Sequence, residues 1–139
     1  MKTVLHLLAV GAALLLGGCQ SGPPALRPAQ SAKFSIESTE KFALLDEMTQ
    51  AAITCSGLQE RVNDAGRLEI VANVKNRGNR SVRVELRCVF KDANGFSTGD
   101  ETPWRTLQLG DGATEAVRYT AGSSLAHKYT IAVRAARGP

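Results

Sequence analysis

The stretch that decides the fold is LEIVANVKNRGNRSVRVELRCVF, residues 68–90. Apolar residues occupy alternate positions from Leu68 to Val74, and they do so again from Val82 to Phe90. A period of two is typical of β-strands that bury one face. The intervening residues, Asn76–Asn79, have the composition of a tight turn. The stretch therefore predicts two β-strands that are joined as a hairpin.

Further strands are expected on both sides of this stretch. Turn signals recur at Asp92–Gly95, Gly110–Gly112 and Gly122–Ser124. The strands that they separate are Ile53–Gly57, Trp104–Leu109, Thr114–Ala121 and His127–Arg134. Turn signals at this spacing, with no long helix to cover a parallel sheet, favour an all-β fold. We expect an antiparallel Ig-like β-sandwich of about six to seven strands.

One short N-terminal helix is expected before these strands. Thr39 can cap its first turn, in which Glu40 lies. Apolar residues then recur at helical spacing, at Phe42, Leu45, Met48 and Ala52. The fold prediction therefore adds one helix to the sandwich.

The N-terminal residues are typical of a bacterial lipoprotein signal peptide. Lys2 precedes the apolar stretch Val4–Leu16, which is shorter than the roughly 20 residues that a membrane-spanning helix needs. The stretch ends in Leu16-Gly17-Gly18-Cys19, which resembles the lipobox, where the cysteine is acylated after cleavage. Gln20 stands where an aspartate usually retains lipoproteins in the inner membrane. We therefore expect a lipid anchor at Cys19 on the periplasmic face of the outer membrane; an ordinary signal peptide is the alternative.

The chain is expected to have three parts. Residues 1–18 are the lipoprotein signal peptide, residues 19–33 are the lipidated cysteine and a proline-rich tether, and residues 34–139 are the β-sandwich domain. A total of 139 residues accommodates only one small domain. The formal net charge of +4 is too small to follow a phosphate backbone. Nucleic acid is therefore not an expected partner.

The second half of the chain resembles a known family. The residues concerned are Asn76 at a strand end, Phe90-Lys91-Asp92 before Gly95, and Pro103-Trp104 before Leu107 and Leu109. Their order and spacing, over about Ile53 to Arg134, resemble the YcfL-like family of small periplasmic lipoproteins from Gram-negative bacteria. This resemblance implies a lipid-anchored periplasmic β-sandwich without known catalysis, whose biochemical role is not established.

Cys55 and Cys88 are additions to the pattern of that family, and they form a pair once Cys19 carries lipid. In an oxidising compartment, an even number of cysteines predicts a disulfide. Cys88 occupies the same set of alternate positions as Leu86 and Phe90, so its side chain is expected to point into the core. The predicted bridge is Cys55–Cys88; two separate buried thiols are the alternative.

The sequence contains few residues that could form a catalytic or metal site. His127 is the only histidine beyond the signal peptide, which excludes a site with several histidine ligands. Ser123, Ser124 and Asp111 could complete a Ser-His-Asp arrangement with His127, but neither serine stands in a Gly-x-Ser-x-Gly elbow. We therefore expect a protein that is not an enzyme, with no catalytic residue, no metal and no cofactor.

The candidate binding residues are arginines and the single tryptophan. Arg77, Arg80, Arg83 and Arg87 gather around the predicted hairpin, and Arg83 and Arg87 alternate onto the outward face of their strand. The simpler interpretations are a solvated face for the arginines and a core position for Trp104. Guanidinium groups bind carboxylates and phosphates, and tryptophan is frequent in protein interfaces. The candidate binding residues are therefore Arg80, Arg83, Arg87 and Trp104.

These features predict an accessory or adaptor lipoprotein that binds another cell-envelope protein, through a strand edge or through the arginine-rich face. The alternative is direct binding of peptidoglycan or lipopolysaccharide by the same face. The two hypotheses differ in their response to salt, because a polyanion held by exposed arginines is released when charges are screened.

Overall fold

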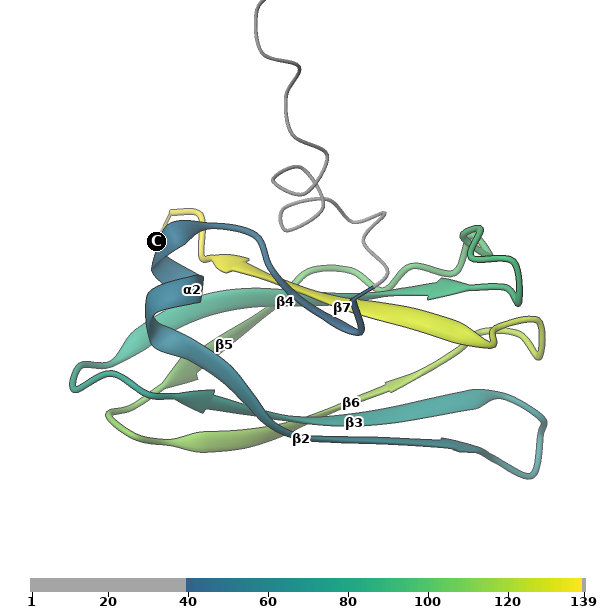
Figure 1. Ribbon diagram of the computed structural model, residues 1–139, viewed down its shortest axis with the longest axis horizontal. Coiled ribbons are helices and arrows are strands. Elements are labelled where there is room, and N and C mark those ends of the chain that lie inside the picture. The colour runs from purple at the N-terminus through teal and green to yellow at the C-terminus, as the bar shows by residue number, and fades with distance from the viewer. Residues whose placement is uncertain (1–39, 139) are drawn as a thin grey trace, which may run out of the picture.

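The computed structural model describes residues 40–138, which form two β-sheets packed face to face (Figure 1). Sheet A has the strand order β1-β7-β4-β5 and sheet B the order β2-β3-β6. The elements are β1 (Phe42–Leu44), α2 (Glu47–Ala52), β2 (Ile53–Val62), β3 (Leu68–Asn76), β4 (Val82–Lys91), β5 (Arg105–Leu109), β6 (Thr114–Thr120) and β7 (Lys128–Ala135). The prediction of an all-β sandwich with one short helix is confirmed. The predicted signal peptide, Cys19, the predicted tether and Thr39 lie outside the described residues.

Strand pairing is antiparallel with one exception. β1 pairs with β7 in parallel, and Phe42 lies opposite Ile131. β2 is an edge strand of sheet B, and it continues beyond the predicted end at Gly57 to Val62, after a bulge between Cys55 and Gly57. A bulge of this kind accommodates an extra residue and bends the strand locally.

The helix begins later than the sequence predicted. Asp46 is its N-cap: its Oδ1 accepts a hydrogen bond from the Thr49 amide at 2.9 Å, and its Oδ2 accepts one from the Ala135 amide at 2.7 Å. Burial raises the pKa of Asp46, but these hydrogen bonds outweigh it and hold the pKa below its usual value. The predicted first turn of the helix is instead strand β1, because Phe42–Leu44 pairs with the edge of β7. Tertiary pairing thus overrides the helical spacing.

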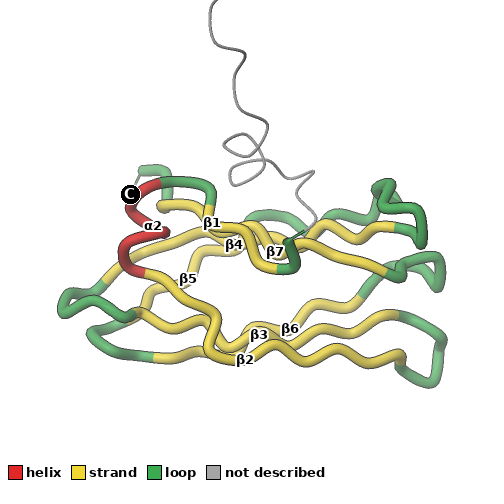
Figure 2. Tube along the Cα trace, viewed as in Figure 1, coloured by secondary structure: helices red, strands yellow, loops and turns green. Residues whose placement is uncertain are grey.

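The predicted hairpin between β3 and β4 is wrong. β3 pairs with β2 and β6, whereas β4 pairs with β5 and β7. Residues 77–81 therefore cross from sheet B to sheet A, and residues 110–113 cross back between β5 and β6. Both crossovers lie at the end of the sandwich where α2 packs, on the left of Figures 1 and 2.

The buried side chain of Asn76 joins these two crossovers. Its Nδ2 donates to the carbonyl oxygens of Arg80 at 2.7 Å, Gly110 at 2.8 Å and Leu109 at 3.3 Å. Its Oδ1 accepts a hydrogen bond from the Gly78 amide at 2.9 Å. Asn76 has no exposed surface, so water cannot replace these partners. One amide group therefore holds together two of the connections between the sheets, from β3 to β4 and from β5 to β6.

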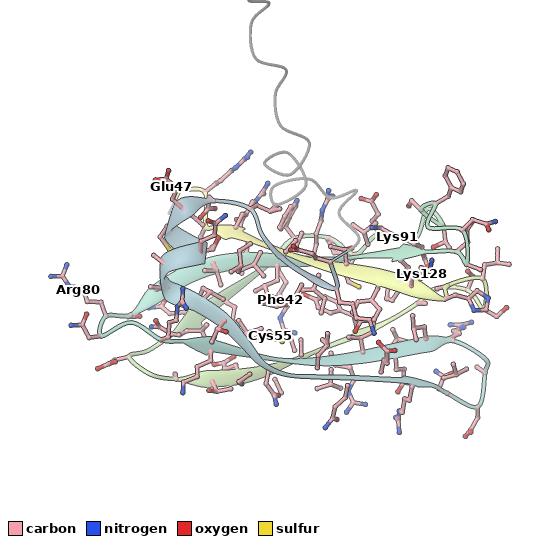
Figure 3. All side chains as sticks on the ribbon, in the orientation of Figure 1. Phe42, Glu47, Cys55, Arg80, Lys91 and Lys128 are labelled. Carbon is pink, nitrogen blue, oxygen red and sulfur yellow. The ribbon has the colours of Figure 1, made fainter. Side chains whose placement is uncertain are left out.

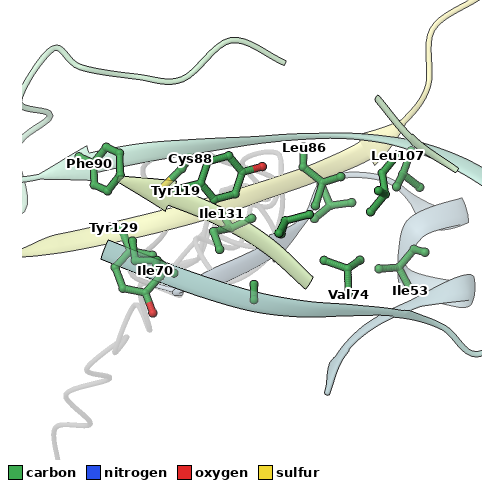
Figure 4. Packing of buried hydrophobic residues seen from close by; sticks show 14 of the residues in the cluster. Ile53, Ile70, Val74, Leu86, Cys88, Phe90, Leu107, Tyr119, Tyr129 and Ile131 are labelled. Carbon is green, nitrogen blue, oxygen red and sulfur yellow. The ribbon is translucent and has the colours of Figure 1, made fainter. Parts of the chain in front are cut away.

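The core lies between the two sheets, as Figure 4 shows. Its largest fully buried side chains include Phe90 and Leu86 from β4, Ile131 from β7, and Ile70 from β3. The alternation predicted for both halves of residues 68–90 is confirmed, because the apolar positions of β3 and β4 face this core. Burial of each large side chain stabilises the fold by roughly 1.5–3 kcal/mol.

We expect Asn76→Ala to lower the free energy of unfolding by about 3 kcal/mol, because it removes a fully buried amide that bonds to three carbonyl oxygens at the crossovers. Asn73→Ala is the matched control, since Asn73 lies on the same strand and is not fully buried. Urea denaturation measures both changes. Equal unfolding midpoints for the two variants would contradict the role of Asn76.

Candidate functional site

The outward face of sheet A carries the charged residues of β4. Arg83, Glu85 and Arg87 alternate with the buried Val84 and Leu86, as the sequence predicted. Arg134 of β7 lies opposite Glu85 in the strand register and therefore shares this face. Trp104, which precedes β5, reaches the same face from the other side of β4.

Two guanidinium groups lie over the indole ring of Trp104. The Cζ atom of Arg134 is 3.8 Å from the ring centroid, and that of Arg87 is 4.8 Å away. A cation over an aromatic face is attracted by the negative charge of the π-system. Because the two arginines come from neighbouring strands, the tryptophan links them across β4 and β7.

Each of these arginines also binds a carboxylate. Arg134 Nε donates to Glu85 Oε2 at 2.8 Å, and Arg87 Nη1 donates to Glu101 Oε2 at 3.0 Å. The hydrogen bond from Arg134 is the main cause that lowers the pKa of Glu85. We call Trp104, Arg87, Arg134, Glu85 and Glu101 the Trp104 cluster. Within the described part of the chain, Arg87 Nε is buried and has no hydrogen-bond acceptor.

The structure brings together only some of the predicted binding residues. Arg87 and Trp104 are in contact, and Arg83 shares their face, where it donates to the carbonyl oxygen of Gly138. Arg80 lies apart, at the tip of the crossover between β3 and β4 (Figure 3). Arg77 is occupied elsewhere, because its Nε donates to the carbonyl oxygen of Ala51 near the C-terminus of α2 at 3.0 Å.

The interpretation of Trp104 as a core residue is wrong. Trp104 is partly exposed and lies on the outer face of sheet A, outside the buried core. Arg134, Glu85 and Glu101 belong to the cluster but were not among the binding residues predicted from the sequence. Arg134 occupies one of the alternate positions of β7 that face outward. No local signal in the sequence, however, indicates that β7 pairs with β4.

Comparisons with known proteins identify the family. Residues 40–135 match the model of a family described as "Protein of unknown function (DUF1425)". The chain belongs to this family. A search of curated proteins gives no match.

Two solved structures resemble this DUF1425 member in fold. The Campylobacter jejuni protein cj0090 has 20% sequence identity and a TM-score of 0.57, over 69% of this chain and 98% of that one. A DUF1425 family member from Shewanella sp. pv-4 also has 20% identity, with a TM-score of 0.55 over 63% of this chain and 81% of that one. At this level of identity the similarity concerns the fold alone.

The predicted disulfide is absent from this DUF1425 member, because Cys55 and Cys88 are free thiols. Cys55 lies at the bulge of β2, where its Sγ donates to the carbonyl oxygen of Gly57 at 3.2 Å. Cys88 belongs to the opposite sheet and is buried beside Tyr119, as Figure 4 shows. Burial raises the pKa of the Cys88 thiol far above its usual value. Each thiol therefore has contacts of its own in place of the predicted bridge.

Two further observations bear on the chemistry of the described residues. Within residues 40–138, no group of three or more histidine, cysteine and acidic side chains could hold a metal ion. In the same range, no helix has the length and apolar composition needed to span a membrane. His127 is exposed just before β7, where it lines a cavity.

We expect both thiols to react when the full chain is purified without reductant, denatured and treated with iodoacetamide. Under native conditions, Cys88 should stay protected, because it is fully buried and its thiolate is disfavoured. Mass spectrometry of proteolytic peptides counts the adducts, and Cys88→Ala gives the reference for a single site. A disulfide-linked peptide that contains Cys55 and Cys88 would contradict the free thiols.

The Glu85–Arg134 pair predicts an acid-dependent loss of stability. A carboxyl group with a lowered pKa in the folded state stabilises the fold above its ordinary value of 4.5, and this contribution is lost as the pH falls through the folded pKa. We expect Glu85→Gln to lower Tm at pH 7 and to lose less stability than wild type on acidification below pH 4.5. Glu115→Gln, which changes an exposed carboxyl group on β6, is the control. If Glu85→Gln kept the acid dependence of wild type, the ion pair would not contribute.

Proposed function

We propose that this DUF1425 member is a non-enzymatic lipoprotein that binds another cell-envelope protein as an accessory or adaptor. Leu16-Gly17-Gly18-Cys19 supports a lipid anchor at Cys19, and Gln20 supports the periplasmic face of the outer membrane. The resemblance to YcfL-like lipoproteins supports the same location. An extended tether at residues 19–33 would let the sandwich domain act away from the lipid surface.

The observation that carries this proposal is the Trp104 cluster. Tryptophan and arginine dominate the residues that contribute most to protein–protein binding. Here two arginines are held over the indole ring, and each is also fixed by a carboxylate. Because these side chains are ordered before a partner arrives, less conformational entropy is lost on binding.

The charges of this face indicate the chemistry of the partner. Arg83 and Arg137 are exposed, and Arg137 lies close enough to Glu85 to lower its pKa. They add positive charge to a cluster whose own arginines are already paired. The complementary partner surface therefore presents acidic side chains around an apolar residue that packs against Trp104.

Binding of lipopolysaccharide or peptidoglycan by the same face has less support. The ion pairs with Glu101 and Glu85 compensate the charges of Arg87 and Arg134, and a polyanion would have to compete with these carboxylates. Arg83 remains the exposed cation of β4 that such a ligand could reach.

The proposal predicts a protein adduct when a photoreactive amino acid replaces Thr106 in cells that express the full chain. Thr106 is exposed and lies opposite Glu85 in the register, so it shares the face of the Trp104 cluster. Thr120 is the matched control, because it is an exposed threonine on β6 of the other sheet. We expect irradiation to link one defined protein at position 106 and not at position 120, in the outer-membrane fraction.

The identity of the adduct distinguishes the hypotheses. A protein adduct that disappears in the Trp104→Ala background supports the adaptor function, whereas adducts only to glycan or lipopolysaccharide support the alternative. Equal labelling at positions 106 and 120 would contradict a site on sheet A. Cys19→Ala tests the lipid anchor separately, because a chain without the acylated cysteine should no longer be found in the membrane fraction.

A further inference from the structure

The most exposed large apolar side chains of the described residues gather at one end of the sandwich. Phe96 is 72% exposed, Val62 67% and Leu125 66%. Val62 ends β2, Phe96 lies in the loop between β4 and β5, and Leu125 lies in the loop between β6 and β7. This end is on the right of Figures 1 and 2, away from α2. Single exposed apolar residues are normal, but a group of them at one place is typical of an interaction site.

Hydrogen bonds hold the loops of Phe96 and Leu125 next to each other. The carbonyl oxygen of Lys91, the last residue of β4, accepts from the His127 amide at 2.9 Å. Asp100 Oδ2, from the loop after β4, accepts from the Gly122 amide at 2.7 Å. The two loops therefore form one surface. We call residues 92–97 the Phe96 loop and residues 121–127 the Leu125 loop.

The Phe96 loop has a fixed shape. Asp92 Oδ1 accepts hydrogen bonds from the Asn94 and Phe96 amides at 2.9 and 3.0 Å, and Gly95 adopts a φ of 91°. This is the turn that the sequence predicted at Asp92–Gly95. Because the turn is held by its own side chain, the exposed ring of Phe96 is presented to a partner without rearrangement of the backbone.

The charge of these loops indicates the chemistry of the partner. Residues 93–97 and 121–128 contain no acidic side chain, and Lys128 adds an exposed ammonium group where the Leu125 loop ends. The flanking carboxylates of Asp92 and Asp100 are half-buried and accept hydrogen bonds from loop amides. Exposed apolar side chains beside a cation suit a phospholipid surface, where apolar groups enter the acyl boundary and the cation contacts phosphate.

The point at which the described chain begins brings this surface close to the proposed lipid anchor. The carbonyl oxygen of Glu40, the first described residue, accepts from Thr130 Oγ1 at 2.9 Å, near the start of β7. Covalent geometry limits the reach from Cys19 to Glu40 to on the order of 70 Å. Such a reach allows either end of the sandwich to face the lipid, so the surface chemistry of the two ends decides the orientation.

We propose that the Phe96 loop and the Leu125 loop dock on the phospholipid surface to which the chain is anchored. Phe96 and Leu125 enter the acyl boundary, and Lys128 lies at the phosphate groups. The inference rests on the lipid anchor of the proposed function, but no residue of the Trp104 cluster takes part. Docking through one end of the strands leaves the outward face of sheet A accessible to another protein.

The experiment measures how close each end of the sandwich lies to lipid. The full chain is purified from membranes and reconstituted into vesicles of phosphatidylethanolamine and phosphatidylglycerol with brominated acyl chains, which quench nearby tryptophan fluorescence. We expect quenching of Phe96→Trp and Leu125→Trp beyond the background that Trp104 gives in wild type. Met48→Trp is the matched control, because Met48 is an exposed apolar residue of α2 at the other end of the sandwich.

Substitutions in the Leu125→Trp chain test the two contributions to docking. Phe96→Ser should lower the ratio of docked to undocked chains at least about tenfold, because the buried apolar surface of the ring is lost. Lys128→Gln should lower it about fivefold, because one cation near the phosphates is removed. Lys75→Gln, which changes an exposed lysine near the end of β3 where the chain leaves sheet B, should leave the ratio unchanged.

Flotation of the same vesicles measures the anchor separately. Chains that float with the vesicles but show no quenching at positions 96 and 125 overturn the docking and leave the anchor intact, whereas chains that do not float contradict both. Quenching of Met48→Trp equal to that of Leu125→Trp also overturns the docking. A photoreactive amino acid at position 96 identifies the occupant in cells: lipid adducts support the proposal, and adducts to protein alone overturn it.

Discussion

The fold of this protein depends on the way a single buried amide closes two crossovers between its sheets. Asn76 donates to carbonyl groups of both residues 77–81 and residues 110–113, and accepts from Gly78. Few side chains combine donors and an acceptor in so small a volume, and an aspartate would repel the same carbonyl oxygens. Because the chain leaves sheet B directly after Asn76, β4 is free to pair with β5 and β7 instead of β3.

This change of sheet creates the candidate interaction site. β4 lies between β5 and β7 in sheet A, so side chains from both neighbouring strands can meet over its outward face. Trp104 lies on the β5 side, where its ring contacts Arg87 of β4. Arg134 lies on the β7 side, where it contacts the Trp104 ring and pairs with Glu85 of β4. A hairpin of β3 and β4 would instead have placed Arg87 beside a strand of sheet B and apart from Arg134 of β7.

Most of the strands could be predicted from the sequence, because alternation is a local pattern that records which side of a strand is buried. The parity of Leu86, Cys88 and Phe90 correctly indicates the core face. Alternation does not record which strand is the neighbour. The sequence therefore predicts the wrong partner for β4, misses Arg134, and pairs two cysteines that lie in different sheets. The misplaced helix start has the same origin, since β1 exists only through its pairing with β7.

The two basic regions of the molecule differ in how their charges are compensated. In the Trp104 cluster each arginine has its own carboxylate and shares an aromatic ring, so the face is ordered and only weakly charged. Such a surface gains more from shape and apolar contact than from long-range attraction. Where β4 ends, Lys41 pairs with Glu60, and Lys91 donates to the buried Thr130. The sandwich thus fixes one group of charges on the face of a sheet and another between its two sheets.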